Sequence, residues 1–246
     1  MRKGLIGFTG FVGSNILKSE QFDELYNSKN INDIEGENFD LLYCAGVPAV
    51  KWFANSNPKE DLTNISNLIN SLREVNASKF ILISTYDVYK STVNVDEDSL
   101  INLSGHHPYG VHRRILELFV KEKFEDYLII RLPALFGKGL KKNIIYDFMN
   151  DNQINKIHSE SKHQFYNLND LTSDINLILK KNIKLINLVT EPIKVREIAN
   201  YCFNVDFNNY TESEPDNYNI SSKYRDFYRT KTDILNQIRH FIKSTD

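Results

Sequence analysis

The stretch of sequence that decides the fold is Leu5-Ile6-Gly7-Phe8-Thr9-Gly10-Phe11-Val12-Gly13. Its apolar residues 5–8 predict a short buried strand, and the apolar periodicity of residues 12–17 predicts a helix directly after it. Glycines at such a junction allow a tight turn and let the backbone approach a pyrophosphate, whose charge the helix N-terminus stabilises. The spacing Gly-x-x-Gly-x-x-Gly differs slightly from the usual Gly-x-Gly-x-x-Gly, and a plain turn is the alternative.

Strands and helices continue to alternate after this turn. Three further apolar segments predict buried strands: 39–44, 79–84 and 127–132. Helices are predicted between them, at 62–75 and from Pro108 onward, where proline suits the first helical turn. Four apolar residues are expected to form the buried face of the second helix: Val111, Ile115, Leu118 and Phe119. The alternation predicts an α/β fold, a doubly wound parallel sheet of the Rossmann type with helices on both faces.

The pattern loosens after about Phe136. Four elements are predicted beyond it: a strand at 185–189, a helix at 195–203, an irregular segment at 204–228 and an amphipathic helix at 232–242. We expect residues 1–136 to form the dinucleotide-binding core, joined by some later segments. Residues 137–246 are expected to form a small, mixed α/β C-terminal lobe that binds the substrate.

Composition narrows the class of protein. The chain has 246 residues, 41% of them hydrophobic and 25% charged, as in a globular protein with a substantial core. The net charge of −2 gives no reason to expect nucleic acid or a membrane surface as a partner. Cys44 and Cys202 are the only cysteines, so neither a disulfide framework nor a cysteine-rich metal site is expected. Glycines interrupt the first apolar run and no run reaches the ~18 apolar residues of a membrane span, so a cytoplasmic protein is expected.

Residues 25–29, where the next strand after the glycine turn is expected to end, bear on the choice of dinucleotide. NAD enzymes usually place an acid about 20 residues after the glycine turn, where it holds the ribose hydroxyls. Asn27, Ser28 and Lys29 occupy that stretch here, a neutral and cationic set that suits a 2′-phosphate. Asp33, followed by Ile34, is expected near the adenine. The segment favours NADP over NAD, with a solvated loop carrying a stray lysine as the alternative.

Several motifs together resemble a known family. They are the glycine turn, Ala45-Gly46 after a strand, Asn64 on the next helix, Ile83-Ser84-Thr85-x-x-Val88-Tyr89, Pro108-Tyr109-Gly110 at a helix start, and residues 131–137 (RLPALFG). Residues 4 to about 203 resemble the extended short-chain dehydrogenases/reductases, and more narrowly the NAD-dependent epimerases and dehydratases that act on nucleotide sugars. The resemblance implies NADP or NAD as cofactor and a nucleotide-sugar substrate, and it is compatible with a homodimer.

The resemblance also implies catalytic residues. The family's acid/base is a tyrosine, assisted by a Ser or Thr that hydrogen-bonds the reacting oxygen, and Tyr109 and Thr85 fall at those places. Bringing a phenol from a pKa near 10 to about 7 requires roughly 4 kcal/mol of preferential stabilisation of the anion. A lysine one helical turn later supplies that charge in the family and holds the nicotinamide ribose, but Arg113 stands there in this sequence. A guanidinium keeps the charge without the compact geometry of an ammonium. Three interpretations of Arg113 stay open. The chain is an enzyme that works with the altered geometry, a slow enzyme, or a binding protein that has lost turnover.

Other positions depart from the family's pattern. An Asp-Glu pair follows the threonine in its dehydratases, whereas Tyr86 and Asp87 stand there in this sequence, so one carboxylate is missing. Ala134 replaces an asparagine that commonly contacts the substrate. These departures favour 4-epimerisation or reduction of a ketone over dehydration. The alternative is a catalytically silent NAD(P)-binding partner or redox-sensing module.

The residues predicted to form the site fall into three groups. The catalytic residues are expected to be Thr85, Asp87, Tyr109 and Arg113. The cofactor is expected to contact Gly7, Thr9, Gly10, Phe11, Val12, Gly13, Asn27, Ser28, Lys29, Asp33, Ile34, Cys44, Ala45, Gly46, Ser84, Tyr109, Arg113 and Leu132. The substrate is expected between the sheet and the later lobe, against Tyr86, Pro133, Lys141, Lys142 and Asn143, the last three offering donors to a diphosphate.

Overall fold

A six-stranded sheet organises the first part of the chain, in a computed structural model that describes residues 1–244. In spatial order its strands are β2 (Glu24–Tyr26), β1 (Lys3–Ile6), β3 (Asn38–Cys44), β4 (Asn76–Thr85), β5 (Tyr127–Leu132) and β9 (Leu185–Asn187). β1 pairs in parallel with β2 and β3, and β3 pairs in parallel with β4, so the carboxyl ends of these strands meet at one edge.

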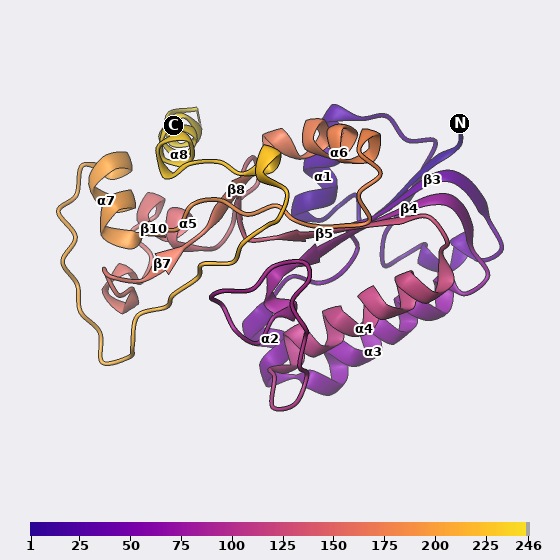
Figure 1. The fold of residues 1–246 in the computed structure, drawn as a ribbon, viewed down its shortest axis with the longest axis horizontal. Coiled ribbons are helices and arrows are strands. Elements are labelled where there is room, and N and C mark those ends of the chain that lie inside the picture. Colours follow the sequence, from indigo (N-terminus) through magenta and orange to yellow (C-terminus); the bar gives the residue numbers. More distant parts are fainter. Residues whose placement is uncertain (245–246) are drawn as a thin grey trace. The chain divides into compact units, whose positions relative to one another are not determined.

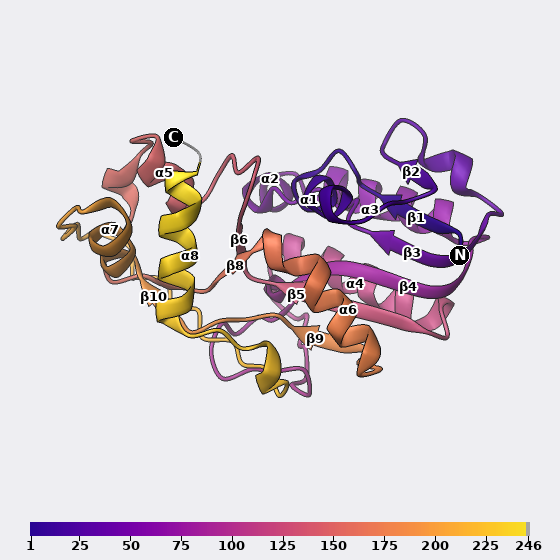
Figure 2. The same ribbon diagram turned by 90° about the horizontal axis from the view of Figure 1, so that it is seen from above.

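Helices cover both faces of this sheet (Figures 1 and 2). On one face lie α1 (Phe11–Ser19) and α6 (Leu171–Lys180), and on the other α3 (Pro58–Leu72) and α4 (Pro108–Lys123). A short helix, α2 (Lys51–Ser56), leads into α3. The arrangement confirms the predicted doubly wound parallel sheet of the Rossmann type.

The chain divides into two compact units, each made of separated segments. The first unit contains residues 1–90, 99–131 and 172–186. The second unit contains residues 91–98, 132–171 and 187–246. The chain therefore leaves the sheet after β5 and returns to it for α6 and β9.

Apolar side chains fill the space between the sheet and the helices α3 and α4. Leu42 and Phe80 of the strands and Ile65 and Leu72 of α3 belong to one buried cluster. Phe80 also stacks on Phe124, with ring centroids 4.1 Å apart. Each such side chain stabilises the fold by about 1.5–3 kcal/mol on burial.

Helix α4 buries a polar stripe, which corrects the predicted apolar face. Leu118, expected inside, is 46% exposed. The other three residues of the predicted face are only partly buried: Val111, Ile115 and Phe119. The helix instead buries Leu116 and Val120 together with three polar residues: His112, Arg113 and Glu117. These polar groups tolerate burial because each has a charged partner inside the unit.

Glu117 is the centre of a buried ion network. Its carboxylate accepts hydrogen bonds from Arg131 (Nε at 2.9 Å and Nη2 at 2.7 Å), from Arg114 at 2.8 Å and from Ser84 Oγ at 2.7 Å. Burial acts to raise the pKa of Glu117, but these donors outweigh it and hold the pKa below its usual range. Arg131 also donates to the Tyr89 hydroxyl at 2.6 Å. The network ties α4 to β4 and β5.

The second unit is built from short elements. β6 (Ala134–Phe136) pairs in parallel with β8 (Phe165–Asn167), and β7 (Lys162–His163) pairs antiparallel with β10 (Ile193–Lys194). Its helices include α5 (Ile144–Met149), α7 (Val195–Phe203) and α8 (Lys231–Lys243). A cluster of buried residues joins them: Phe136, Ile145, Phe165, Ile193, Ile198, Ile234, Leu235 and Ile238. The second unit therefore combines short strands with helices around a core of its own.

Residues 204–228 are largely irregular, as predicted, with one 3-10 turn at Arg225–Phe227. Buried side chains hold this segment to the rest of the second unit. Gln164 exchanges two hydrogen bonds with the backbone of Ile220, both 2.9 Å long. Glu97 accepts a hydrogen bond from Ser222 Oγ at 2.6 Å.

Among the helices within residues 1–244, none combines the length and the apolar character that crossing a membrane requires.

Candidate active site

The glycine turn joins β1 to α1 and depends on two of its glycines for its shape. Gly7 has a φ of +86°, and an added Cβ would lie 2.4 Å from the Cα of Gly46, so no side chain fits there. A Cβ at Gly13 would lie 2.1 Å from the carbonyl oxygen of Gly7, so this glycine lets α1 pack directly on the turn. These two positions are therefore required by the fold.

Gly10 differs, because neither its backbone nor close packing demands glycine. Its φ is −77°, and an added Cβ would crowd a single atom, the Gly7 carbonyl oxygen at 3.2 Å. Gly10 is the N-cap of α1, where no side chain caps the helix and no acidic residue stands in the first turn. Such an N-terminus presents backbone N–H groups and the positive end of the helix dipole to an anion. The residues present therefore fit a pyrophosphate, since Gly10 places no side chain in front of this N-terminus.

The segment after β2 forms a turn of its own. The Asn30 Oδ1 atom accepts a hydrogen bond from the Asn27 N–H at 2.7 Å, and Asn27 Oδ1 accepts one from the Lys29 N–H at 2.8 Å. Ser28 and Lys29 are exposed at the end of β2. Asp33 is exposed as well, whereas the side chain of Ile34 is fully buried in the core. The exposed hydroxyl of Ser28 and the exposed ammonium of Lys29 are the groups in this turn that suit a ribose phosphate.

The carboxyl end of β3 packs against the glycine turn through its backbone. The Ala45 N–H donates to the Ile6 carbonyl at 2.9 Å. The Cys44 side chain is fully buried, and burial raises the pKa of its thiol to about 11. A ligand at this strand end would therefore meet the backbone of residues 44–46 rather than the thiol.

Two predicted catalytic residues meet at the carboxyl end of β4. The Asp87 N–H donates to Thr85 Oγ1 at 3.1 Å, and Thr85 Oγ1 lies 3.4 Å from the Asp87 carboxylate. The same carboxylate forms an ion pair with Lys51, the first residue of α2, at 2.5 Å. A short loop connects the end of β3 to Lys51. Because β3 is the parallel neighbour of β4, this loop places Lys51 at the carboxyl ends of the strands. The neighbouring Ser84 turns away toward Glu117 in the core.

The first turn of α4 packs directly on this strand end and places Tyr109 beside it. A Cβ added at Gly110 would lie 2.2 Å from the Asp87 carbonyl oxygen, so α4 could not approach so closely with any other residue. The Tyr109 N–H donates to Asn55 Oδ1 of α2 at 3.0 Å. The first turn of α4, which carries Tyr109, therefore lies against the backbone of Asp87.

His107 caps α4 and has a defined tautomer. Its Nδ1 atom accepts a hydrogen bond from the Gly110 N–H at 3.0 Å, so the neutral ring carries its proton on Nε2. Burial lowers the pKa of His107 to about 4, and the charge of Lys51 acts in the same direction. The ring is therefore neutral at pH 7.

Arg113 is held between the Tyr109 ring and helix α3. Its guanidinium carbon lies 3.9 Å from the centroid of that ring. One Nη atom donates to the Asp61 carboxylate and the other to the Pro48 carbonyl oxygen. Asp61 also pairs with His112 Nδ1 at 2.6 Å. Arg113 is only 4% exposed, so this cation is fixed on the face of the phenol ring and its Nη atoms are committed to protein oxygens.

The surroundings of Tyr109 keep its phenol protonated. Burial raises the pKa of Tyr109 to about 12; the Arg113 charge opposes this rise and the Asp87 charge adds to it. The phenol is therefore a proton donor at neutral pH in the protein without ligands.

The residues predicted for the substrate fall in different surroundings. In the first unit Tyr86 is 6% exposed. In the second unit Pro133 is buried and Lys141 and Lys142 are exposed. The amide of Asn143 is engaged within its own unit, because it accepts from the N–H groups of residues 145 and 146 and donates to the backbone of residue 135. Leu132, predicted to touch the cofactor, is 3% exposed.

Four polar residues near Tyr109 and Arg113 were not predicted: Lys51, Asn55, Asp61 and His107. Lys51 could have been found from its position in the sequence. It follows the end of a predicted strand by a few residues, and ligands of parallel sheets bind at such strand ends. Nothing local in the sequence distinguishes Asp61 from the other acids of α3.

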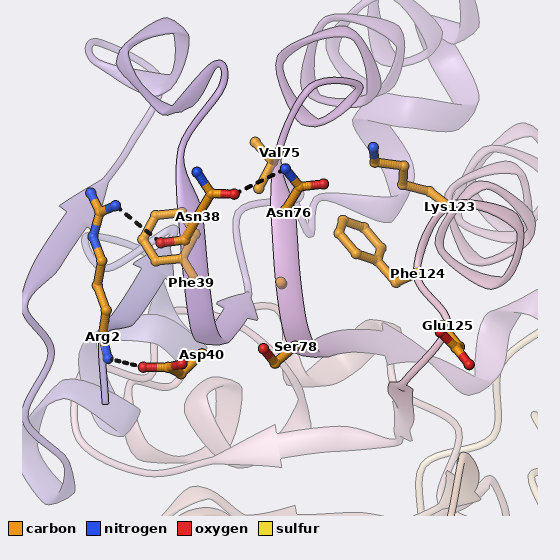
Figure 3. A pocket seen from close by; sticks show the side chains of 11 residues that line it. Arg2, Asn38, Phe39, Asp40, Val75, Asn76, Ser78, Lys123, Phe124 and Glu125 are labelled. Atoms are coloured by element: carbon orange, nitrogen blue, oxygen red, sulfur yellow. Dashed lines mark hydrogen bonds between the residues drawn. The ribbon is translucent and has the colours of Figure 1, made fainter.

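A separate cavity of about 390 Å³ lies at the opposite edge of the sheet (Figure 3). Asn38 and Asn76, the first residues of β3 and β4, line it together with Arg2. Its polar groups satisfy one another, since Arg2 donates to the Asn38 carbonyl and Asn76 Nδ2 donates to Asn38 Oδ1, both at 3.0 Å. Ligands of doubly wound sheets bind at the carboxyl ends of the strands, so this cavity is not the candidate site.

The glycine turn and the parallel sheet together define a dinucleotide-binding protein of the Rossmann class. Residues 5–178 match the family model described as "NAD dependent epimerase/dehydratase family", and the chain belongs to this family. Family membership confirms the predicted resemblance and identifies the chain as an enzyme of an NAD(P)-dependent family. No curated protein sequence matches the chain significantly.

Solved structures with the same fold cover the whole chain at low sequence identity. MoeE5 in complex with UDP-glucose and NAD has a TM-score of 0.77 and 13% identity over 100% of this chain and 98% of its own. The dTDP-4-dehydrorhamnose reductase from Bacillus anthracis in complex with NADP has a TM-score of 0.77 and 16% identity over 100% and 99%. The UDP-N-acetylglucosamine 4-epimerase from Methanobrevibacter ruminantium M1 has a TM-score of 0.75 and 14% identity over 98% and 97%. Identities this low show the fold alone.

Proposed function

We propose that this chain is an NAD(P)-dependent epimerase or reductase that acts on a nucleotide-activated sugar. In this proposal Tyr109 exchanges a proton with the reacting oxygen and Thr85 hydrogen-bonds the same oxygen. The family supports the reaction class. One solved structure of the same fold is a complex with UDP-glucose and NAD, and another is a complex with NADP. These ligands support a nucleotide sugar as the substrate and NAD(P) as the cofactor.

The observation that carries the proposal is the position of Arg113 over the ring of Tyr109. A cation within about 6 Å of an aromatic centroid is attracted to the ring. It stabilises a tyrosinate more than a neutral phenol, because the anion adds a full charge. Arg113 therefore supplies the electrostatic part of the function that a lysine has in the family.

Of the two reactions, the surroundings of Tyr109 favour reduction. A phenol with a pKa of about 12 is fully protonated at neutral pH and suits the donor side of a proton transfer. A dinucleotide bound at the glycine turn would supply the hydride. Tyr109 donates its proton to the carbonyl oxygen of the sugar as that oxygen gains negative charge, and the charge left on Tyr109 is stabilised by Arg113. Epimerisation starts with the opposite transfer, which the raised pKa of Tyr109 disfavours.

The chain offers groups for both ligands. The N-terminus of α1 at Gly10 suits the pyrophosphate, and the exposed Ser28 and Lys29 favour NADP over NAD. Lys141 and Lys142 of the second unit are exposed and suit the diphosphate of the nucleotide sugar. The Asn143 amide caps α5, so we assign it no ligand.

A second function, an NAD(P)-binding module without turnover, has its own support. Both Nη atoms of Arg113 are committed to Asp61 and Pro48, and the pKa of Tyr109 is raised rather than lowered. Such a protein would bind the dinucleotide and leave every sugar unchanged.

The experiment that separates the two functions measures NADPH and NADH oxidation with a panel of nucleotide-activated 4-keto sugars. Chromatography of nucleotide-sugar mixtures, run in parallel, detects epimerisation. We expect ketone-dependent oxidation of NADPH that Tyr109→Phe abolishes. Tight binding of NADPH without conversion of any panel member would instead support the silent module.

A further inference from the structure

A lysine outside every predicted motif stands at the carboxyl end of β4. Lys51 begins α2, and its Nζ atom lies 2.5 Å from Asp87 Oδ1. The two residues are 36 positions apart in the sequence, so only the fold brings them together. Asp87 in turn contacts Thr85, and α4 packs on the Asp87 backbone next to Tyr109.

The Asp87 carboxylate is held in place before any ligand binds. Its own N–H donates to Thr85 Oγ1, and its carbonyl oxygen accepts a hydrogen bond from His106 Nε2 at 2.8 Å. Both the backbone and the side chain of Asp87 are therefore fixed. A site whose polar groups are fixed in advance loses little conformational entropy on binding.

The Lys51–Asp87 pair is accessible, unlike the other ion pair of this region. The side chains of Lys51 and Asp87 are 37% and 16% exposed, whereas those of Arg113 and Asp61 are 4% and 2% exposed. A ligand can therefore approach the Lys51–Asp87 pair from solvent, whereas the Arg113–Asp61 pair is closed to it. The ammonium donates hydrogen bonds and the carboxylate accepts them, so the pair offers both kinds of group to a ligand that carries hydroxyls.

We propose that Lys51 and Asp87 bind two neighbouring hydroxyl groups of a sugar ring. One hydroxyl donates to the Asp87 carboxylate, and the other accepts from the Lys51 ammonium. Lys51 is then the ligand-binding cation at this strand end, whereas the Arg113 side chain is only 4% exposed and donates to Asp61 and Pro48 inside the protein. The inference rests on the proposed function and deepens it by naming the groups that recognise the sugar.

A pair of neighbouring hydroxyls occurs both in the ribose of the dinucleotide and in the hexose of a nucleotide sugar. Calorimetry with matched probes distinguishes these sources. NADP is compared with adenosine 2′,5′-bisphosphate, which lacks the nicotinamide ribose, and UDP-glucose is compared with UDP, which lacks the hexose. The variants are Lys51→Met, Lys51→Arg and Asp87→Asn, with Lys59→Met, an exposed lysine of α3, as the control.

We expect Lys51→Met and Asp87→Asn to weaken either NADP or UDP-glucose by about tenfold or more, since each removes a hydrogen bond to a charged group. The shorter probe of the same pair should bind as in the wild type, and Lys51→Arg should recover most of the loss. Loss confined to NADP assigns the diol to the ribose, and loss confined to UDP-glucose assigns it to the hexose. Trp52, the chain's sole tryptophan and 70% exposed beside Lys51, gives a fluorescence record of the same titrations.

Two results would overturn the inference, and they differ. If the wild type binds NADP and both Lys51→Met and Asp87→Asn bind all four probes as tightly, the diol site is wrong while the proposed function stands. If the wild type binds neither NADP, NAD nor any nucleotide sugar, the proposed function fails and the diol site fails with it.

Discussion

Asp61 of α3 accepts a hydrogen bond from Arg113 of α4, and both side chains are almost completely buried. Burial acts to raise the pKa of Asp61, but Arg113 and then His112 outweigh it and hold the pKa below its usual range. The pair joins two helices on the same face of the sheet and fixes the cation over Tyr109. The stability of the fold and the electrostatics of the candidate active site therefore depend on one contact.

Asp61→Asn tests this dependence. The variant leaves the Arg113 charge buried without its counter-charge, which typically costs about 3–5 kcal/mol. We expect the free energy of unfolding, measured by urea denaturation, to fall by about 3 kcal/mol. Glu60→Gln, at an exposed position of the same helical turn, is the matched control and should change it by less than about 0.5 kcal/mol. Equal effects of the two variants would contradict a stabilising role for the buried pair.

Tyr109→Phe tests the assigned proton donor. Only the phenolic oxygen is removed, so we expect turnover to fall by about 10²-fold or more while NADP affinity changes less than about threefold. The ring remains available to Arg113, so the melting temperature should change little. Tyr127→Phe, at the first residue of β5, is the control for loss of a phenolic hydroxyl away from the site. Unchanged turnover in Tyr109→Phe would remove α4 from the catalytic machinery.

Gly10 and Gly13 should respond differently to alanine. Gly13→Ala places a Cβ 2.1 Å from the Gly7 carbonyl oxygen, so we expect a marked loss of thermal stability. Gly10→Ala meets a single atom at 3.2 Å and should leave a folded protein that binds NADP much more weakly, because the methyl group occupies the approach to the helix N-terminus. Circular dichroism melts and calorimetry measure the two effects. Wild-type NADP affinity in Gly10→Ala would place the pyrophosphate elsewhere.

Glu117 should make stability depend on pH in the acid range. Its pKa is lower in the folded chain than in the unfolded chain, so the stability that it contributes is present above the ordinary glutamate pKa of about 4.3 and is lost as the pH falls through its folded value. Urea denaturation from pH 7 to pH 3 measures this slope. Glu117→Gln should be less stable at pH 7 by about 3 kcal/mol and should have a shallower slope below pH 5. Parallel pH curves for the two proteins would exclude Glu117 as a source of acid sensitivity.

Local sequence patterns predicted the sheet well. The strand predicted at 127–132 and the helix at 195–203 have the bounds of β5 and α7, because both are set by runs of neighbouring residues. The glycine turn could also be predicted from the sequence. Gly13 contacts Gly7 within the same short motif, and Gly7 contacts the residues that directly follow the adjacent strand.

The buried face of α4 could not be read in the same way. Apolar periodicity selects Leu118, yet the helix turns Arg113 and Glu117 inward, because partners distant in the sequence neutralise them. Asp61 lies 52 residues before Arg113 and Arg131 lies 14 residues after Glu117. A single sequence gives no sign of such pairs. Lys51 was not predicted as a site residue for the same reason, because its partner Asp87 lies 36 positions away. The division of the chain at residue 136 stays a prediction.

The order in which the segments enter the two units has a consequence for synthesis on the ribosome. β5 ends at Leu132, and its neighbour β9 begins at Leu185, with part of the second unit encoded between them. At typical translation rates of about 5–20 residues per second, the growing chain waits several seconds with one edge of its main sheet unpaired. An unpaired strand edge invites pairing with other chains. Nascent-chain aggregation should therefore concentrate on chains that stop between residues 133 and 184, and neither unit can be expressed as a simple truncation of the gene.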